Sequence, residues 1–136
     1  MASALYTTYK TLALTTGGVN LLTDTIKCVL VDSADYTASL GTHDFLVDVP
    51  AGARVGTAQT LASKTVTAGV FDAADVTFPS VTGDQSEYVL IYKDTGTEAT
   101  SNLIALIDTA SGLPSTPTGA DITITWDNGA NRIFAL

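Results

Sequence analysis

One cysteine and one histidine are present among the 136 residues of the chain. Cys28 has no partner for an internal disulfide, and Cys28 and His43 together supply too few ligands for a structural zinc site. Basic residues are also scarce: six Lys and Arg stand against fourteen Asp and Glu, which gives a net charge of -8. Such a surface repels a nucleic-acid backbone, so nucleic acid is not an expected partner.

Long apolar runs are missing as well. No segment approaches the roughly 20 consecutive apolar residues that span a bilayer. The first ten residues lack the basic start and the continuous apolar stretch of a signal peptide. We therefore expect a soluble protein that is made in the cytoplasm and has no membrane partner.

The size of the chain predicts a single domain, 1–136, built around one core. Its first part is ambiguous. Residues 1–22 fit either a helix, with Leu5, Tyr9 and Leu12 on one face, or a Thr-rich strand. They would form an N-terminal arm or a flanking element of the domain.

Threonine and aspartate are abundant. The chain has 23 Thr, and its acidic residues are 12 Asp and 2 Glu. Threonine favours strands, and aspartate favours turns over helix interiors. The composition therefore predicts an all-β domain, and short apolar or alternating runs between turn signals are typical of a sandwich or barrel.

Eight segments have the length and pattern of strands: 25–32, 52–57, 64–68, 75–78, 87–93, 102–108, 120–126 and 131–136. The segment 52–57 is the weakest of them and is expected at an edge. Segments 87–93 and 102–108 are apolar on both faces, so we expect central strands that are covered on both sides within the chain or by a neighbouring subunit.

Three further elements are predicted between these strands. Residues 42–48 are expected to form a short helix that Thr42 caps. Residues 109–119 contain two Pro and two Gly and are expected to form a loop. Asn128-Gly129 is a strong signal for a hairpin turn that joins the last two strands.

Aspartate follows both of the most apolar segments. Asp94 begins an Asp-Thr-Gly tripeptide, the form that carries the catalytic carboxylate of aspartic proteases, and Asp108 is followed by Thr and Ala. A protease dyad needs two carboxylates about 3 Å apart that share one proton. Consecutive antiparallel strands place their ends at opposite edges of the sheet, so we expect Asp94 and Asp108 to lie far apart in turns, with Lys93 keeping Asp94 ionised. A small hydrolase that uses them is the weakest alternative.

Other chemical sites are equally weak. Cys28 is expected to be buried in a strand, and His43 to lie at a helix start or in a loop, so a nucleophile and base pair is not expected. The carboxylates of Asp72 and Asp75 and of segment 83–87 are interpreted as turn residues because they lack the alternating ligands of a Ca²⁺ loop. Trp126 is interpreted as a core residue; the alternative is a sugar-stacking platform. No catalytic, cofactor or metal residue is therefore assigned.

Several segments resemble a family of small proteins that tailed bacteriophages encode. The resemblance runs from about Leu22 to the C-terminus and is carried by 22–36, 64–70, 74–78, 82–87, 91–100 and 126–131. Small β-rich phage proteins of this size include capsid cement or decoration proteins, some with a jelly-roll fold, which dimerise on the shell and clamp neighbouring major capsid subunits.

The resemblance implies a non-enzymatic virion structural protein on the capsid surface, with the major capsid protein and a second copy of the chain as partners. It also implies a two-sheet antiparallel sandwich of jelly-roll type. A tail or fibre component is the alternative within the structural class. A carbohydrate-binding sandwich that uses Trp126 is an alternative from another class.

Overall fold

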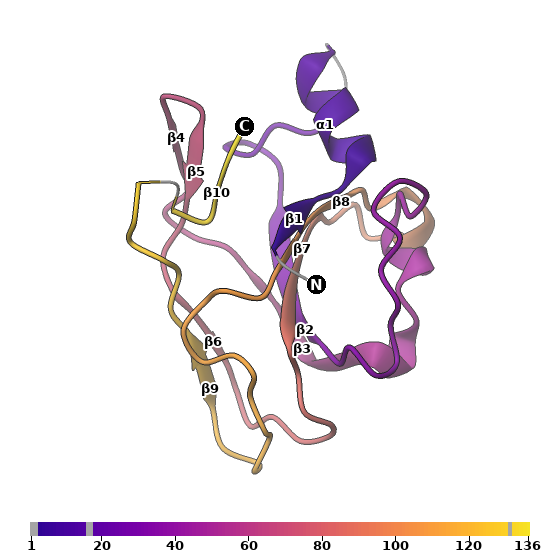
Figure 1. Cartoon of the computed structure of the whole chain (residues 1–136), viewed down its shortest axis with the longest axis vertical. Coiled ribbons are helices and arrows are strands. Elements are labelled where there is room, and N and C mark those ends of the chain that lie inside the picture. Colours follow the sequence, from indigo (N-terminus) through magenta and orange to yellow (C-terminus); the bar gives the residue numbers. More distant parts are fainter. Residues whose placement is uncertain (1–2, 16–17, 131) are drawn as a thin grey trace.

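Antiparallel strands are the main regular secondary structure of the computed structural model, which describes residues 3–15, 18–130 and 132–136 (Figure 1). The strands are β1 (Ala4–Leu5), β2 (Ile26–Val31), β3 (Arg54–Thr60), β4 (Thr65–Thr67), β5 (Val70–Asp72), β6 (Val76–Phe78), β7 (Tyr88–Lys93), β8 (Leu103–Ile107), β9 (Ile122–Ile124) and β10 (Phe134–Ala135). The helical elements are α1 (Thr7–Leu14) and the 3-10 turns η1 (Leu46–Asp48), η2 (Ala51–Ala53) and η3 (Glu98–Thr100). The structure is thus mostly β, which agrees with the predicted all-β class except for the helix α1 and the three 3-10 turns.

The largest sheet has five strands in the order β1-β8-β7-β2-β3. Its central strands β7 and β8 are buried on both faces, as their doubly apolar sequences predict. Side chains alternate between two clusters along β7, so that Ile91 packs on one face and Leu90 on the other. The segment expected at an edge is also confirmed there, as β3.

One face of this sheet packs against two smaller sheets, one in the order β10-β5-β4 and the other formed by β6 and β9. Phe71, Phe78 and Ile124 of the smaller sheets share a core with Ile91 and Ile104 of the large one. All of these side chains are at most 1% exposed. The core therefore extends from the sheet β10-β5-β4 at one end of the molecule to the pair of β6 and β9 at the other end (Figure 1).

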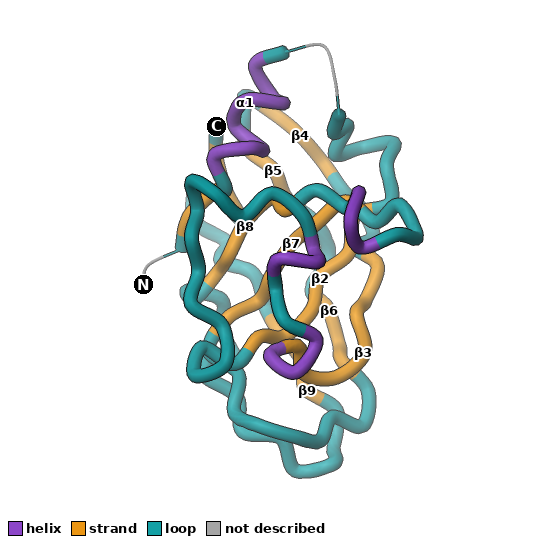
Figure 2. Tube along the Cα trace, turned by 90° about the vertical axis from the view of Figure 1, so that its right-hand side faces the viewer, coloured by secondary structure: helices purple, strands orange, loops and turns teal. Residues whose placement is uncertain are grey.

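The other face is covered by irregular chain instead of a sheet. The segment between β2 and β3, which includes η1 and η2, runs across it (Figure 2). Tyr36, Leu46 and Val49 of this segment pack with Leu90 and Leu106 of the sheet. One face of the large sheet is therefore covered by strands, and the other face is covered by irregular chain.

The helix predicted at 42–48 is wrong in extent, because only Leu46–Asp48 is helical and forms a single 3-10 turn. Phe45 is extended and bridges to Asn102, beside the start of β8. That pairing uses the backbone groups that a longer helix would need. The predicted cap is also wrong: the carboxylate of Asp48, not Thr42, accepts the backbone N–H groups of Asp44 and Phe45 at 2.9 and 3.0 Å.

The hairpin predicted at Asn128-Gly129 is also wrong. β9 pairs with β6, and β10 pairs with β5 through Phe134 and Phe71. The rings of these two Phe residues lie 5.2 Å apart in the core. Burial of these side chains therefore outweighs the local turn preference, and the Asp127 carboxylate accepts the N–H of Gly129 in a simple turn.

The described part of residues 1–22 contains both a strand and a helix, the two alternatives that its sequence left open. β1 adds to the large sheet beside β8, and α1 follows directly. Tyr9 is the buried residue of this helix, and its ring meets Phe134 edge to face at 5.7 Å. Most of the described part of 1–22 is thus integrated into the fold, while residues 1–2 and 16–17 lie outside the described residues.

The loop expected at 109–119 contains no strand or helix. It is held by two isolated bridges, from Ser111 to Thr125 and from Ser115 to Ser86. Among the described residues, we find no helix with the length and hydropathy needed to cross a membrane.

Candidate functional site

Asp94 lies in a turn immediately after β7. Its Oδ1 accepts the backbone N–H of Gly96 at 3.0 Å, and Gly96 has a φ of +85°, which favours glycine. Its Oδ2 lies 3.0 Å from Nζ of Lys27. The Gly96 hydrogen bond and the Lys27 ammonium hold the pKa of Asp94 below its usual range. The expectation that Lys93 would do this is wrong, because Lys93 pairs with Asp24 at 3.2 Å.

Asp108 lies at the opposite end of the same pair of strands, because β7 and β8 are antiparallel neighbours. Its Oδ1 accepts the hydroxyl of Ser3 at 2.8 Å, and its own N–H donates to Ser3 Oγ at 2.8 Å. The two carboxylates are therefore separated by the length of the hairpin, as the sequence predicts. In this arrangement Asp94 and Asp108 cannot share a proton.

Cys28 and His43 lie on opposite sides of the large sheet. Cys28 is fully buried in the core shared with the smaller sheets, and burial raises the pKa of its thiol to about 12. His43 stacks on Tyr36 with ring centroids 5.5 Å apart, and its Nδ1 lies 2.9 Å from the Tyr36 hydroxyl. Tyr36 belongs to the cluster on the other face. The sheet thus keeps the thiol and the imidazole apart.

The Tyr36 hydroxyl also bonds to the buried hydroxyl of Tyr6 at 2.8 Å. Burial raises the pKa of Tyr6, so this phenol stays protonated. The three side chains of Tyr6, Tyr36 and His43 form one chain of hydrogen bonds that ties the segment after β2 to the start of α1. Sequence patterns alone did not single out this network.

Trp126 is only 3% exposed. Its indole Nε1 donates to the carbonyl of Ala74 at 3.0 Å, and its backbone N–H donates to Oδ1 of Asp75 at 2.9 Å. The indole face is therefore packed in the core and does not form a platform for a sugar ring. Asp75 is a structural acceptor, and Asp72 lies 3.9 Å from Arg132.

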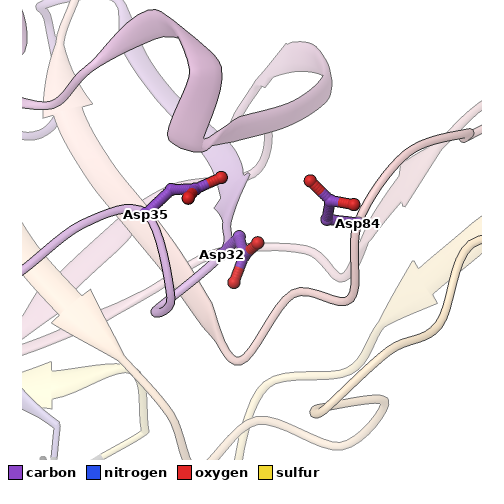
Figure 3. Close-up of side chains that lie close together, drawn as sticks. All are labelled: Asp32, Asp35 and Asp84. Atoms are coloured by element: carbon purple, nitrogen blue, oxygen red, sulfur yellow. The ribbon is translucent and has the colours of Figure 1, made fainter.

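Three carboxylates do come together, between the turn after β2 and the loop before β7 (Figure 3). Oxygen atoms of Asp32, Asp35 and Asp84 lie within 4.8 Å of one another. Asp32 is buried and accepts the N–H of Ala34 at 2.8 Å, while Asp35 and Asp84 are exposed. Carboxylate oxygens of this kind are ligands that Ca²⁺ and Mg²⁺ prefer.

The neighbouring Glu87 holds these two segments together. Its Oε1 accepts both the N–H and the hydroxyl of Ser33 at 2.8 Å. Sequence analysis considered Asp84 and Glu87 but missed Asp32 and Asp35. The signal was an Asp-x-x-Asp pattern directly after an apolar strand, the same pattern as Asp72 and Asp75. Only the tertiary structure brings Asp84 to it.

We expect Asp84→Asn to stabilise the protein by up to about 1 kcal/mol, because two carboxylates less than 5 Å apart repel by about this amount in water. Thermal unfolding in EDTA at low ionic strength measures the effect. Asp35→Asn should behave in the same way, and 1 M NaCl should remove both gains. Equal Tm values of the wild type and Asp84→Asn in EDTA would contradict this, whereas a Tm that rises with CaCl₂ in the wild type only would show that the cluster binds the cation.

Exposed apolar side chains gather at one end of the molecule. Among the described residues, five large apolar side chains are exposed. Four of them define what we call the apolar end: Leu14 (82%), Leu22 (51%), Val66 (44%) and Leu136 (59%). The fifth, Val47, lies in η1, away from this end. Figures 1 and 2 both place α1 and the β4–β5 hairpin at this end.

The apolar end is hollowed by an open groove of about 610 Å³. Its apolar lining includes Tyr9, Leu12, Leu22, Val66 and Leu136. The groove thus lies between the N-terminal helix, the β4–β5 hairpin and the last residue of the chain. Exposed apolar residues gathered around such a groove are typical of a protein interaction surface.

Two sequence comparisons give no relative from which a role could be transferred. A scan against protein-family models finds no match to the chain. A search of curated proteins finds no match either.

Proposed function

We propose that the chain is a non-enzymatic virion structural protein, a capsid cement or decoration subunit that binds the outer surface of a tailed-phage head. The observation that carries the proposal is the apolar end, a surface suited to contact with another protein. The resemblance of residues 22–136 to small phage proteins supplies the setting, a phage head on which the major capsid protein and a second copy of the chain are the expected partners.

The engagement of the chemically reactive side chains adds support. Asp94, Asp108, Trp126 and His43 each make hydrogen bonds or ion pairs within the fold, and Cys28 is a buried protonated thiol. These contacts stabilise the fold, and a structural role is enough to explain why these residues are present. We therefore favour binding to another protein over catalysis at these residues.

The proposal includes the finer expectation of a two-sheet sandwich of jelly-roll type. Its support is the single core between the large sheet and the two smaller sheets, which together act as the second layer. Many copies on a shell would bind with avidity, so that each contact could be modest.

Particles of the phage that encodes the chain test this function. We expect mass spectrometry to find the chain in purified heads, in a constant ratio to the major capsid protein. We also expect added protein to bind heads that lack it.

Asp94→Asn should bind as the wild type does, because this carboxylate shapes only its own turn. Recovery in separated tails would favour a tail component, and absence from heads and tails would contradict both structural roles. Pepstatin-sensitive peptide cleavage that Asp94→Asn abolishes would favour the hydrolase.

A further inference from the structure

We propose that the apolar end is the interface of a homodimer in which the β4 strands of two copies pair edge to edge. The proposal deepens the proposed function, and it rests on that function only for the setting on a phage shell. The occupant of the surface would be a second copy of this chain. Three observations at this end carry the inference: a free strand edge, exposed apolar side chains and a local balance of charge.

The free edge belongs to β4, the last strand in the sheet β10-β5-β4. Ala68 and Gly69 have φ values of 52° and 78°, so the β4–β5 hairpin has a two-residue turn of type I′. Thr67 and Val70 flank this turn and form a hydrogen-bonded pair. Val66, one residue earlier, therefore directs its N–H and C=O away from β5. Among the described residues, no segment outside the sheet bonds to the backbone of Val66.

Nothing in the sequence of β4 prevents edge pairing by the usual means. Natural edge strands often carry a charged residue or proline that blocks a second strand. β4 consists of Thr65, Val66 and Thr67, and all three are exposed. Because the strand is short, its backbone bonds alone would be weak, and the apolar residues around it would contribute the rest of the binding energy.

Charge distinguishes this end from most of the surface. Two copies with a charge of -8 each repel one another, so a stable contact needs a region that is locally neutral or basic. At the apolar end, Asp24 pairs with Lys93 at 3.2 Å, and Lys64 donates to the backbone carbonyl of Asp24. Next to β4, Asp72 lies opposite Thr65 and 3.9 Å from Arg132. Acidic and basic groups thus stand in close pairs at this end, and this local balance of charge limits the repulsion between copies.

If a twofold axis passes through Val66, the outward N–H and C=O groups of Val66 form hydrogen bonds in both copies. Each Val66 N–H would donate to the carbonyl of Val66 of the partner subunit, and Thr65 would face Thr67 of the partner subunit. No like charges stand opposite each other in this register. The Val66 side chains would lie together on the groove side of a continuous six-stranded sheet.

The test is the mass of the isolated full chain in solution. Sedimentation equilibrium should give twice the 14.0 kDa chain mass at micromolar concentrations, dissociating on dilution. Val66→Asp places two carboxylates opposite each other at the axis and should weaken association more than about 100-fold. Val66→Pro removes the outward N–H, which the hairpin itself does not use, and should also give a monomer.

Val47→Asp is the matched control, because Val47 is also exposed, at 55% against 44% for Val66, but lies in η1, away from the apolar end. It should leave the dimer intact. Circular dichroism would show that all three variants fold. A wild-type chain that stays monomeric up to about 100 μM, or a dimer that survives both Val66 variants, would overturn the proposal. A folded Val66→Asp monomer that still binds phage heads would separate this interface from the proposed function.

Discussion

Trp126→Ala is expected to lower the free energy of unfolding by about 3–5 kcal/mol, the usual cost of deleting a buried large aromatic side chain. Trp126 is 3% exposed and packs in the core between the large and small sheets. Its removal leaves a cavity in the core cluster that also contains the fully buried Ile124 and Phe78. It also leaves the carbonyl of Ala74 without its indole donor. Urea unfolding followed by far-UV circular dichroism measures the loss.

Trp126→Phe separates the cavity from the hydrogen bond. Phenylalanine retains most of the apolar volume but cannot donate to Ala74, so we expect a smaller loss of about 1–3 kcal/mol. Similar stability of both variants and the wild type would contradict the assignment of Trp126 to the core. Glycan binding that only Trp126→Ala abolishes, with the fold intact, would restore the carbohydrate-binding alternative.

Gly112→Ala is the second substitution with a large expected effect, about 2–5 kcal/mol of destabilisation. Gly112 has a φ of +106°, and a Cβ at this position would lie 2.8 Å from the backbone oxygen of Thr123. That oxygen belongs to β9 and cannot rotate away as a flexible side chain could. Relief of the clash would pull the loop from β9 and strain the bridge between Ser111 and Thr125.

Gly119→Ala is the matched control for this prediction. Gly119 lies in the same loop with a φ of +86°, but a Cβ there would meet no atom within 4 Å. We expect only the conformational cost of a left-handed residue, about 1–2 kcal/mol. Equal losses in the two variants, measured by urea unfolding, would show that the contact with Thr123 is unimportant.

The central strands were predictable because their sequences are unambiguous. Segments 87–93 and 102–108 are apolar at nearly every position, and only a strand covered on both faces buries all of them. The separation of Asp94 and Asp108 followed from the same argument, since adjacent antiparallel strands end at opposite edges. Burial of Cys28 and Trp126 followed from their neighbours in the sequence.

Local signals failed where distant segments compete for the same backbone. Asn128-Gly129 favours a hairpin, but β10 pairs with β5 because Phe134 packs on Phe71 in the core. The predicted helix at 42–48 gives way to a bridge between Phe45 and Asn102. In both cases contacts between residues far apart in sequence outweigh a turn or helix preference of about 1 kcal/mol.

The amino-acid sequence by itself determined the mostly β class, the two central strands and the separation of Asp94 from Asp108, because these depend on composition and on patterns within single segments. Only the tertiary structure decided which strands pair beyond the β7–β8 hairpin. It also gathered Asp32, Asp35 and Asp84, and it placed Leu14, Leu22, Val66 and Leu136 at one end. These groupings join residues from across the chain, and long-range packing sets them.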